Sequence, residues 1–228
     1  MGSNLPLTAS DGHQFVAYLA QPSRPTTAAV VIVQEIFGVN RHIRSIVDYY
    51  ATQGFTAMAP GLFDRVQPGL QLNYNSADAS RGMQIATQIG LEKALLDVSA
   101  AVNHAAKGNP QTKVGIIGFC YGGTLAWLAA TRLNPAAAVG YYGGQITRFI
   151  NEKPNCPVML HFGANDKHIP TSEIEKIQQA HPEVPVFVYE GAGHGFNCDQ
   201  RPDYNPRAAN LARERTVAFL RTQLQQSE

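Results

Sequence analysis

The sequence predicts a single α/β domain over residues 1–228, with a mostly parallel central sheet and helices on both of its faces. Short runs rich in β-branched residues alternate with longer amphipathic stretches, the pattern of parallel strands joined by helices. Several of these runs are apolar on both faces, as strands covered on each side are. Apolar residues make up 44% of the 228 residues, and no repeat or Pro/Gly/Ser-rich linker divides the chain. One core of substantial size is therefore expected.

The first quarter of the chain contains three expected strands and one helix. Residues 15–19 predict an antiparallel edge strand, and residues 28–34, AAVVIVQ, predict a fully buried strand. Asn40 is an N-cap candidate for a helix whose apolar positions share one face: Ile43, Ile46, Val47 and Tyr50. Residues 55–59 predict the next strand, which Pro60 ends.

The stretch 64–81 shows no clear period. It is long for a loop in a compact domain, and such loops are often lids or binding loops. After it, residues 91–106 predict a helix with Leu95, Val98 and Val102 on its buried stripe. A loop near the functional site, followed by a helix, is therefore expected here.

The second half of the chain continues the alternation. The expected strands are 113–118, 137–142, 157–162 and 184–189, and the expected helices are 122–132, 171–180 and the tail from Asn205 onward. This order completes the parallel sheet with its covering helices.

Composition excludes several classes of function. A net charge of +1 with 15% charged residues does not supply the basic face that nucleic acids or membrane surfaces require. No apolar run is long enough to span a membrane, and the N-terminus MGSNLPLTAS has neither a secretory pattern nor, because of Pro6, a myristoylation motif. Three irregularly spaced cysteines predict free thiols in the cytoplasm. We expect a small-molecule substrate, with a monomer or a small homo-oligomer both left open.

The segment 113–123, KVGIIGFCYGG, has the form of a nucleophile elbow with Cys120 at its centre. A nucleophile at a tight strand-to-helix turn needs small residues two positions before and two after it, and Gly118 and Gly122 meet that need. The helix that follows favours a thiolate, and the Tyr121 N–H is a candidate oxyanion-hole donor.

Two alternatives to this interpretation exist. Cys120 could be a buried core cysteine at a glycine-rich turn. Class I glutamine amidotransferases also carry G-x-C-x-G, but they continue to a glutamine where this chain has Thr124, and they place a His-x-Glu downstream where His194 is followed by Gly-Phe. The position between a buried strand and a helix favours the elbow.

The partners of a triad are found in the order that α/β-hydrolases use: nucleophile, acid, histidine. Asp166 and His194 each follow an expected strand, and glycines surround His194. A turn aspartate and a turn histidine are the alternatives. No His-x-x-x-His or Cys-x-x-Cys spacing occurs, so no metal is expected.

Four segments together resemble the dienelactone hydrolases, or carboxymethylenebutenolidases. They are QEIFGVN at 34–40, GFCYGG at 118–123, VGYYG at 139–143 and GAGHGF at 191–196. The resemblance covers nearly the whole chain. It implies an α/β-hydrolase fold and a Cys-His-Asp triad without a cofactor, which hydrolyses dienelactones to maleylacetate in the breakdown of chlorinated aromatics.

The resemblance also assigns residues. It implies that Ile36 supplies the second oxyanion N–H, and that Glu35 contacts the resting cysteine until substrate displaces it. Independently, Glu35 ends a buried strand, where a purely structural carboxylate would be poorly solvated, although a cap or an ion pair remains an alternative.

Substrate-binding residues are less clearly marked. The family binds the substrate carboxylate with two arginines; Arg81 lies in the region of the first, but Cys198 occupies the place of the second, and Arg201 is three residues further on. Both arginines could instead be solvated surface residues. Phe37, Tyr141 and Tyr142 are expected to line an apolar pocket or to belong to the core. Cys198 and Cys156 are expected to be bystanders.

Two rival functions follow. The first is a general carboxylesterase or thioesterase with the same triad. The second is a non-catalytic ligand-binding protein on the same scaffold, which an intact triad argues against.

Overall fold

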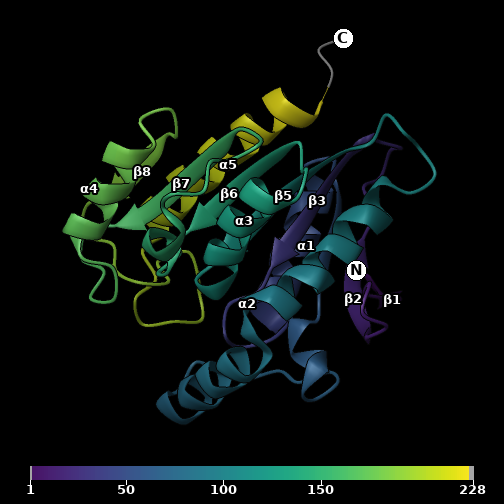
Figure 1. Ribbon diagram of the computed structural model, residues 1–228, viewed down its shortest axis with the longest axis horizontal. Coiled ribbons are helices and arrows are strands. Elements are labelled where there is room, and N and C mark those ends of the chain that lie inside the picture. The colour runs from purple at the N-terminus through teal and green to yellow at the C-terminus, as the bar shows by residue number, and fades with distance from the viewer. Residues whose placement is uncertain (1, 226–228) are drawn as a thin grey trace.

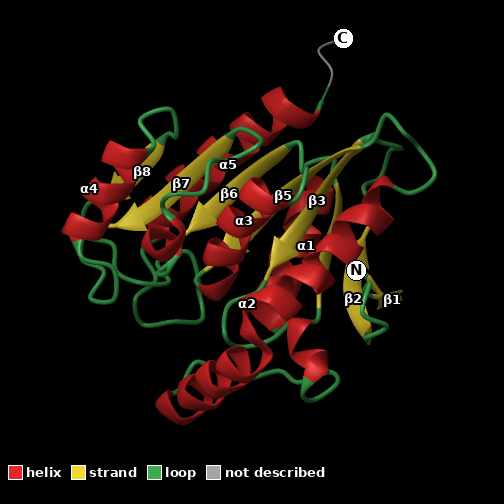
Figure 2. Ribbon diagram, in the orientation of Figure 1, coloured by secondary structure: helices red, strands yellow, loops and turns green. Residues whose placement is uncertain are grey.

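An eight-stranded sheet runs through the molecule in the order β1-β2-β4-β3-β5-β6-β7-β8. The computed structural model describes residues 2–225. The strands are β1 (Ser3–Thr8), β2 (Gln14–Ala20), β3 (Ala28–Val33), β4 (Thr56–Pro60), β5 (Lys113–Phe119), β6 (Ala137–Tyr141), β7 (Val158–Gly163) and β8 (Val186–Tyr189). The pairs β1/β2 and β2/β4 are antiparallel, and the other five are parallel (Figure 2). The predicted mostly parallel sheet is confirmed.

Helices cover both faces of this sheet. They are α1 (Arg41–Thr52), α2 (Ser76–Ala106), α3 (Tyr121–Arg132), α4 (Thr171–Ala180) and α5 (Pro206–Leu224), with short 3₁₀ helices η1 (Leu62–Arg65) and η2 (Ile146–Phe149). In Figure 1, α2, α3 and α4 lie in front of the sheet and α5 lies behind it. Helix α1 shares the face of α5, since the Arg213 guanidinium lies 5.0 Å from the Tyr49 ring centroid. Within residues 2–225, no helix has the length and apolarity to cross a membrane.

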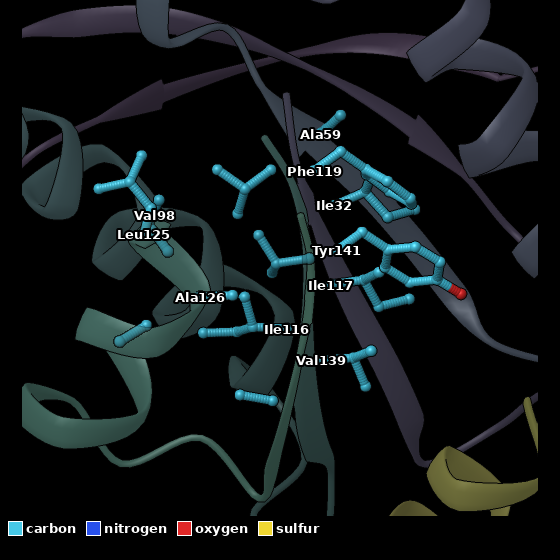
Figure 3. Packing of buried hydrophobic residues seen from close by; sticks show 14 of the residues in the cluster. Ile32, Ala59, Val98, Ile116, Ile117, Phe119, Leu125, Ala126, Val139 and Tyr141 are labelled. Carbon is cyan, nitrogen blue, oxygen red and sulfur yellow. The ribbon is translucent and has the colours of Figure 1, made fainter. Parts of the chain in front are cut away.

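The core lies on both sides of the central strands. All six residues of β3 are buried, because neighbouring side chains on this strand face opposite helical layers. Figure 3 shows the same alternation on β5, where Ile116 points toward the helix that carries Leu125, and Ile117 points to the other face. The central strands are thereby held between two apolar layers.

The N-terminal edge of the sheet differs from the prediction. Strand β2 is antiparallel, as expected, but it is not the edge, because β1 pairs with it from Ser3↔Leu19 to Thr8↔Gln14. Leu7 is the one fully buried residue of β1, so the strand has too weak an apolar pattern to be recognised. Pro6 fits an edge strand, which can lack a backbone N–H donor.

The stretch 64–81 is also more ordered than expected. Helix α2 begins at Ser76, where the Asn75 side chain accepts a hydrogen bond from the Asp78 N–H, and it continues through a break at Gly90, whose φ is 73°. The predicted helix 91–106 is therefore the second half of α2. The first half was missed because its buried face includes the small residues Gly82 and Ala86, which do not give an apolar stripe.

Candidate active site

The three predicted triad residues meet at the carboxyl edge of the sheet. Cys120 follows β5, Asp166 follows β7 and His194 follows β8. Asp166 Oδ2 lies 2.7 Å from His194 Nδ1, and His194 Nε2 lies 3.1 Å from Cys120 Sγ. This geometry places a base next to a thiol and a carboxylate behind the base, the arrangement that nucleophilic catalysis needs.

The backbone holds Cys120 in a conformation that few residues adopt. Its φ is 54° and its ψ is −111°, which costs about 1–3 kcal/mol unless the surroundings enforce it. They do so through close backbone packing: a Cβ at Gly118 would overlap the Gly122 carbonyl, and a Cβ at Gly122 would overlap the Val33 carbonyl. The two glycines that predicted the elbow are therefore required sterically.

The charges of the triad stabilise one another. Burial raises the pKa of Asp166, but the hydrogen bond and charge of His194 and the N–H groups of His168 and Ile169 outweigh it and hold that pKa below its usual value. Burial lowers the pKa of His194, but the charge of Cys120 and the hydrogen bonds that the imidazole makes with Asp166 and Cys120 raise it to about 10. These shifts favour an imidazolium at His194 beside an ionised Asp166 at neutral pH.

The loop after β3 lies against the elbow. The Gly122 N–H donates to the Gln34 carbonyl at 3.1 Å. The Gln34 amide accepts from the Leu62 N–H and donates to the Glu35 carbonyl, each at 3.2 Å. The backbone of Ile36 is thereby fixed beside the first turn of α3, where the Tyr121 N–H has no partner within the helix. Both predicted oxyanion donors thus lie on segments that border Cys120.

Glu35 is fully buried, and its hydrogen bonds differ from the expectation. The Tyr74 hydroxyl donates to Oε2 at 3.0 Å, and Arg201 Nη1 lies 3.4 Å from Oε1. Over residues 2–225, no hydrogen bond joins Glu35 to Cys120, so the contact with the resting cysteine that the resemblance implies is not among the hydrogen bonds of this carboxylate. The carboxylate oxygens are instead held by a phenol and a guanidinium.

Arg201 and Phe37 lie beside this carboxylate. The Arg201 guanidinium is 5.9 Å from the ring centroids of both Phe37 and Tyr74, which themselves lie 4.5 Å apart. Burial lowers the pKa of Arg201, but the charge of Glu35 outweighs it and raises the pKa overall. Arg201 is therefore a partly buried cation at the site and not a solvated surface residue.

Arg81 is placed differently. Its side chain is exposed, and its Nη2 atom donates to Gln67 Oε1 at 2.7 Å. The next residue, Gly82, packs directly against the Ile36 carbonyl. Arg81 therefore borders the loop after β3 while its guanidinium is engaged with Gln67.

The adjacent residues Tyr141 and Tyr142 point to different parts of the molecule. The Tyr142 ring centroid lies 5.1 Å from that of His194, and its buried hydroxyl has no hydrogen-bond partner among the described residues. The Tyr141 hydroxyl lies 2.6 Å from the Thr216 hydroxyl on α5. Tyr141 is therefore a core residue on the far face of the sheet, the second of the two alternatives expected for it, and not a substrate-binding residue.

Three further polar residues surround Glu35. Tyr74 comes from the stretch without a clear period, His42 from the first turn of α1, and Cys198 from the loop after His194. The candidate ligand atoms of Glu35, His42 and Cys198 all lie within 4.8 Å of one another. Cys198 was expected to be a bystander; it lies instead against the site. Only its position four residues after His194 marked it in the sequence.

Fold and site together define an α/β-hydrolase, in which a thiol, a carboxylate and an imidazole occur in the order Cys, Asp, His at the carboxyl edge of a mostly parallel sheet. The fold is shared with an esterase from Pyrococcus furiosus, 14% identical, with a TM-score of 0.70 over 98% of this chain and 93% of that one.

The family is narrower than the fold. The model of the dienelactone hydrolase family matches residues 15–224. The carboxymethylenebutenolidase of Pseudomonas putida is 34% identical over 92% of this chain and 92% of that protein. The crystal structure of a candidate dienelactone hydrolase from Klebsiella pneumoniae, 28% identical, has a TM-score of 0.79 and covers 96% of this chain and 98% of that one. The chain belongs to the dienelactone hydrolase family, and it is a hydrolase.

Proposed function

We propose that this hydrolase opens an enol-lactone of the dienelactone type through Cys120, His194 and Asp166. The observation that carries the proposal is the position of His194, whose two ring nitrogens lie 2.7 Å from Asp166 and 3.1 Å from Cys120. The carboxymethylenebutenolidases among the relatives support the substrate class.

In the first half of the reaction, the Cys120 thiolate attacks the carbonyl carbon of the lactone. The carbonyl oxygen becomes an oxyanion, which the N–H groups of Ile36 and Tyr121 stabilise. When the intermediate collapses, the carbon–oxygen bond of the ring breaks, and the departing enolate takes the proton of the His194 imidazolium. The product is a thioester on Cys120 that carries the opened chain.

In the second half, neutral His194 takes a proton from a water molecule, and the resulting hydroxide attacks the thioester. The carboxylic acid is released, and the thiolate–imidazolium pair forms again. Asp166 fixes the tautomer of His194 throughout. Because a thiolate is itself a good leaving group, the first step favours substrates whose own leaving group is good, such as enol esters.

The surroundings of the triad fit an anionic substrate. Arg201 holds a positive charge beside the site, and its present partner Glu35 is a carboxylate that a substrate carboxylate can replace. Arg81, beside the loop that carries Ile36, is the second candidate cation. Phe37 and Tyr142 supply apolar surface next to these groups.

The setting of the enzyme is part of the same proposal. We infer one catalytic domain that acts in the cytoplasm on a small molecule, with no nucleic-acid partner, no membrane partner and no cofactor in the reaction. Each step above uses side chains and water alone.

Hydrolysis of cis- and trans-dienelactone, followed by ultraviolet absorbance beside neutral aryl acetates, tests the proposal. Cys120→Ala is expected to lower turnover by about a thousandfold or more, since the nucleophile is lost. Cys156→Ala, which removes a thiol elsewhere, is expected to keep full activity. Full activity of Cys120→Ala on every substrate would overturn the proposal.

A general carboxylesterase or thioesterase is the second candidate. The observation that favours it is the hydrogen bond of Arg81 with Gln67, which leaves Arg201, among residues 2–225, as the one cation that contacts Glu35. Turnover of aryl acetates through Cys120, without turnover of dienelactone, would support this candidate over the first.

A further inference from the structure

Glu35, His42 and Cys198 form a compact buried group beside the triad. Their side chains come from the loop just after β3, the first turn of α1 and the loop between β8 and α5. All three residues are buried, and one candidate ligand atom from each lies within 4.8 Å of the other two. His42 lies in a helix, and Glu35 lies in a loop that the hydrogen bonds of the Gln34 side chain hold in place.

The buried imidazole of His42 makes no hydrogen bond among the described residues. Neither ring nitrogen has a hydrogen-bond partner among residues 2–225, although the side chain is almost fully buried. In proteins, the large majority of buried polar atoms have a hydrogen-bond partner. An imidazole without one, next to a thiol and a carboxylate, therefore calls for an explanation. The nearest charged atom is Asp199 Oδ1, 3.3 Å from His42 Nδ1.

We propose that Glu35, His42 and Cys198 bind a zinc ion. The bonds of zinc to nitrogen, oxygen and sulfur, about 2.0–2.3 Å long, separate tetrahedral ligand atoms by about 3.3–3.7 Å. From the limit of 4.8 Å, the ligand atoms would have to approach one another by up to about 1.5 Å, which side-chain rotation can supply. A thiolate and an imidazole with one carboxylate suit zinc, whereas magnesium and calcium require oxygen ligands throughout.

The neighbours of the group match what a zinc site needs. Asp199 Oδ1 lies 3.3 Å from His42 Nδ1 without a formed hydrogen bond, and a small rotation of this exposed side chain would let it accept from Nδ1 and present Nε2 to the ion, as carboxylates behind zinc-bound histidines do. A cavity of about 180 Å³, lined by Asn197, Asp199 and Tyr204 among others, reaches the group at His42. Three protein ligands leave the fourth position to water.

Arg201 and Tyr74 already contact Glu35, but they leave lone pairs of its carboxylate oxygens free for an ion. Each of the two residues donates to one carboxylate oxygen and so uses one lone pair, whereas a carboxylate offers about four lone-pair sites. The loss of the Cys198 proton on binding gives the ion two anionic ligands, which balance its charge. Because Glu35 is shared, an ion here also weakens the hold of Glu35 on Arg201, and so connects metal binding to the catalytic site.

Cobalt(II) tests the site, because it takes tetrahedral sulfur and nitrogen ligands and gives a thiolate charge-transfer band in the near ultraviolet. The full chain with Cys120→Ala is the parent, so that a metal bound to the catalytic thiol cannot produce the band. We expect the parent to give the band, to bind one cobalt per chain, and to release it on addition of one equivalent of zinc.

The variants identify the ligands. On the parent, Cys198→Ser is expected to abolish the band, and His42→Gln to weaken binding of zinc by more than the roughly 10- to 100-fold that loss of a second-shell partner costs. Cys156→Ala, which also removes a thiol, is the matched control and is expected to keep both. Circular dichroism checks that each variant folds.

Three results would overturn the proposal: a parent that binds no ion at micromolar zinc, a band that survives Cys198→Ser, or a band that Cys156→Ala abolishes. If Cys198→Ser does not fold, His42→Gln decides, since zinc affinity equal to that of the parent would also exclude the site.

Discussion

The Nε2 atom of His194 lies 3.1 Å from the Sγ atom of Cys120, although 74 positions separate the two residues in the sequence. Two different parallel strands, β5 and β8, bring them to the same edge of the sheet. The contact is therefore set by the order of the strands, and any change that shifts one strand end relative to the other alters the chemistry.

The charge of Cys120 is expected to control the titration of His194. With the pKa of His194 raised to about 10, its imidazolium persists through neutral pH and loses its proton only as the pH rises toward 10. In Cys120→Ala the raising charge is gone while burial, which lowers the pKa, remains, so the pKa is expected to fall. Nuclear magnetic resonance of labelled histidines measures both values.

His161 is the internal control in that experiment. Burial lowers its pKa to about 3, so it is expected to stay neutral across the same range in both proteins. An unchanged titration of His194 in Cys120→Ala would show that Cys120 carries no charge at the site.

Gly122 is expected to be intolerant of even one methyl group. A Cβ there would overlap the backbone carbonyls of Val33 and Gln34, neither of which can move without displacing β3. Gly122→Ala should lower the free energy of unfolding by about 3 kcal/mol, as overpacking of a core does. Urea denaturation measures it.

Gly144→Ala is the matched control for that substitution, because a Cβ there meets Ile169 at an ordinary 3.7 Å. Its effect should stay within about 0.5 kcal/mol. Equal losses for the two variants would contradict the steric account of the elbow.

Arg201→Gln is expected to discriminate between charged and neutral substrates. Loss of a charge-assisted hydrogen bond, worth about 1.5–3 kcal/mol, should raise KM for dienelactone about 10- to 100-fold and leave KM for aryl acetates unchanged. Arg81→Gln should show a smaller effect of the same kind, because its guanidinium is exposed and engaged with Gln67.

Arg148→Gln, an exposed arginine on η2 that donates to Gln145, serves as the control for both arginine variants. A rise of KM for neutral and anionic substrates alike would mean that Arg201 has a structural role and not a role in binding charge.

A buried ion pair stabilises α2. The Asp97 carboxylate is fully buried and accepts from Arg65 Nε and Nη2, both at 2.8 Å. Asp97→Ala leaves the largely buried guanidinium without this partner, and the expected loss of unfolding free energy is about 3 kcal/mol. Thermal and urea denaturation check it.

Asp11, the second and more exposed partner of Arg65, gives the comparison. Its replacement by alanine should cost much less, since solvent screens that pair. A larger loss for Asp11→Ala than for Asp97→Ala would contradict this assignment.

Features that depend on local pattern could be predicted from the sequence. The buried strand 28–34 is marked by an unbroken apolar run, and the elbow is marked by glycines two positions before and two positions after Cys120. Strand β1 and the first half of α2 could not be predicted, because Leu7 alone is fully buried in one and small residues pack the other. A segment with so few large apolar residues does not show the periodicity from which a strand or a helix is predicted.

The environment of Glu35 could not be predicted for a different reason. Its partners Tyr74 and Arg201 lie 39 and 166 positions away and come from segments without regular structure. The directions of Tyr141 and Tyr142 depend likewise on the point where β6 ends and the backbone turns, since φ of Tyr142 is 39°. Such details are settled by tertiary packing.

The break at Gly90 separates α2 into two parts with different tasks. In the part before it, Gly82 packs against the Ile36 carbonyl, while in the part after it, the ion pair of Asp97 with Arg65 connects the helix to η1. A glycine with φ of 73° and no atom within 4 Å of a Cβ position lets the two parts meet at an angle without strain. Because the break lets the first part take its own direction, substitutions before position 90 are expected to move the loop that carries Ile36 more than substitutions after it do.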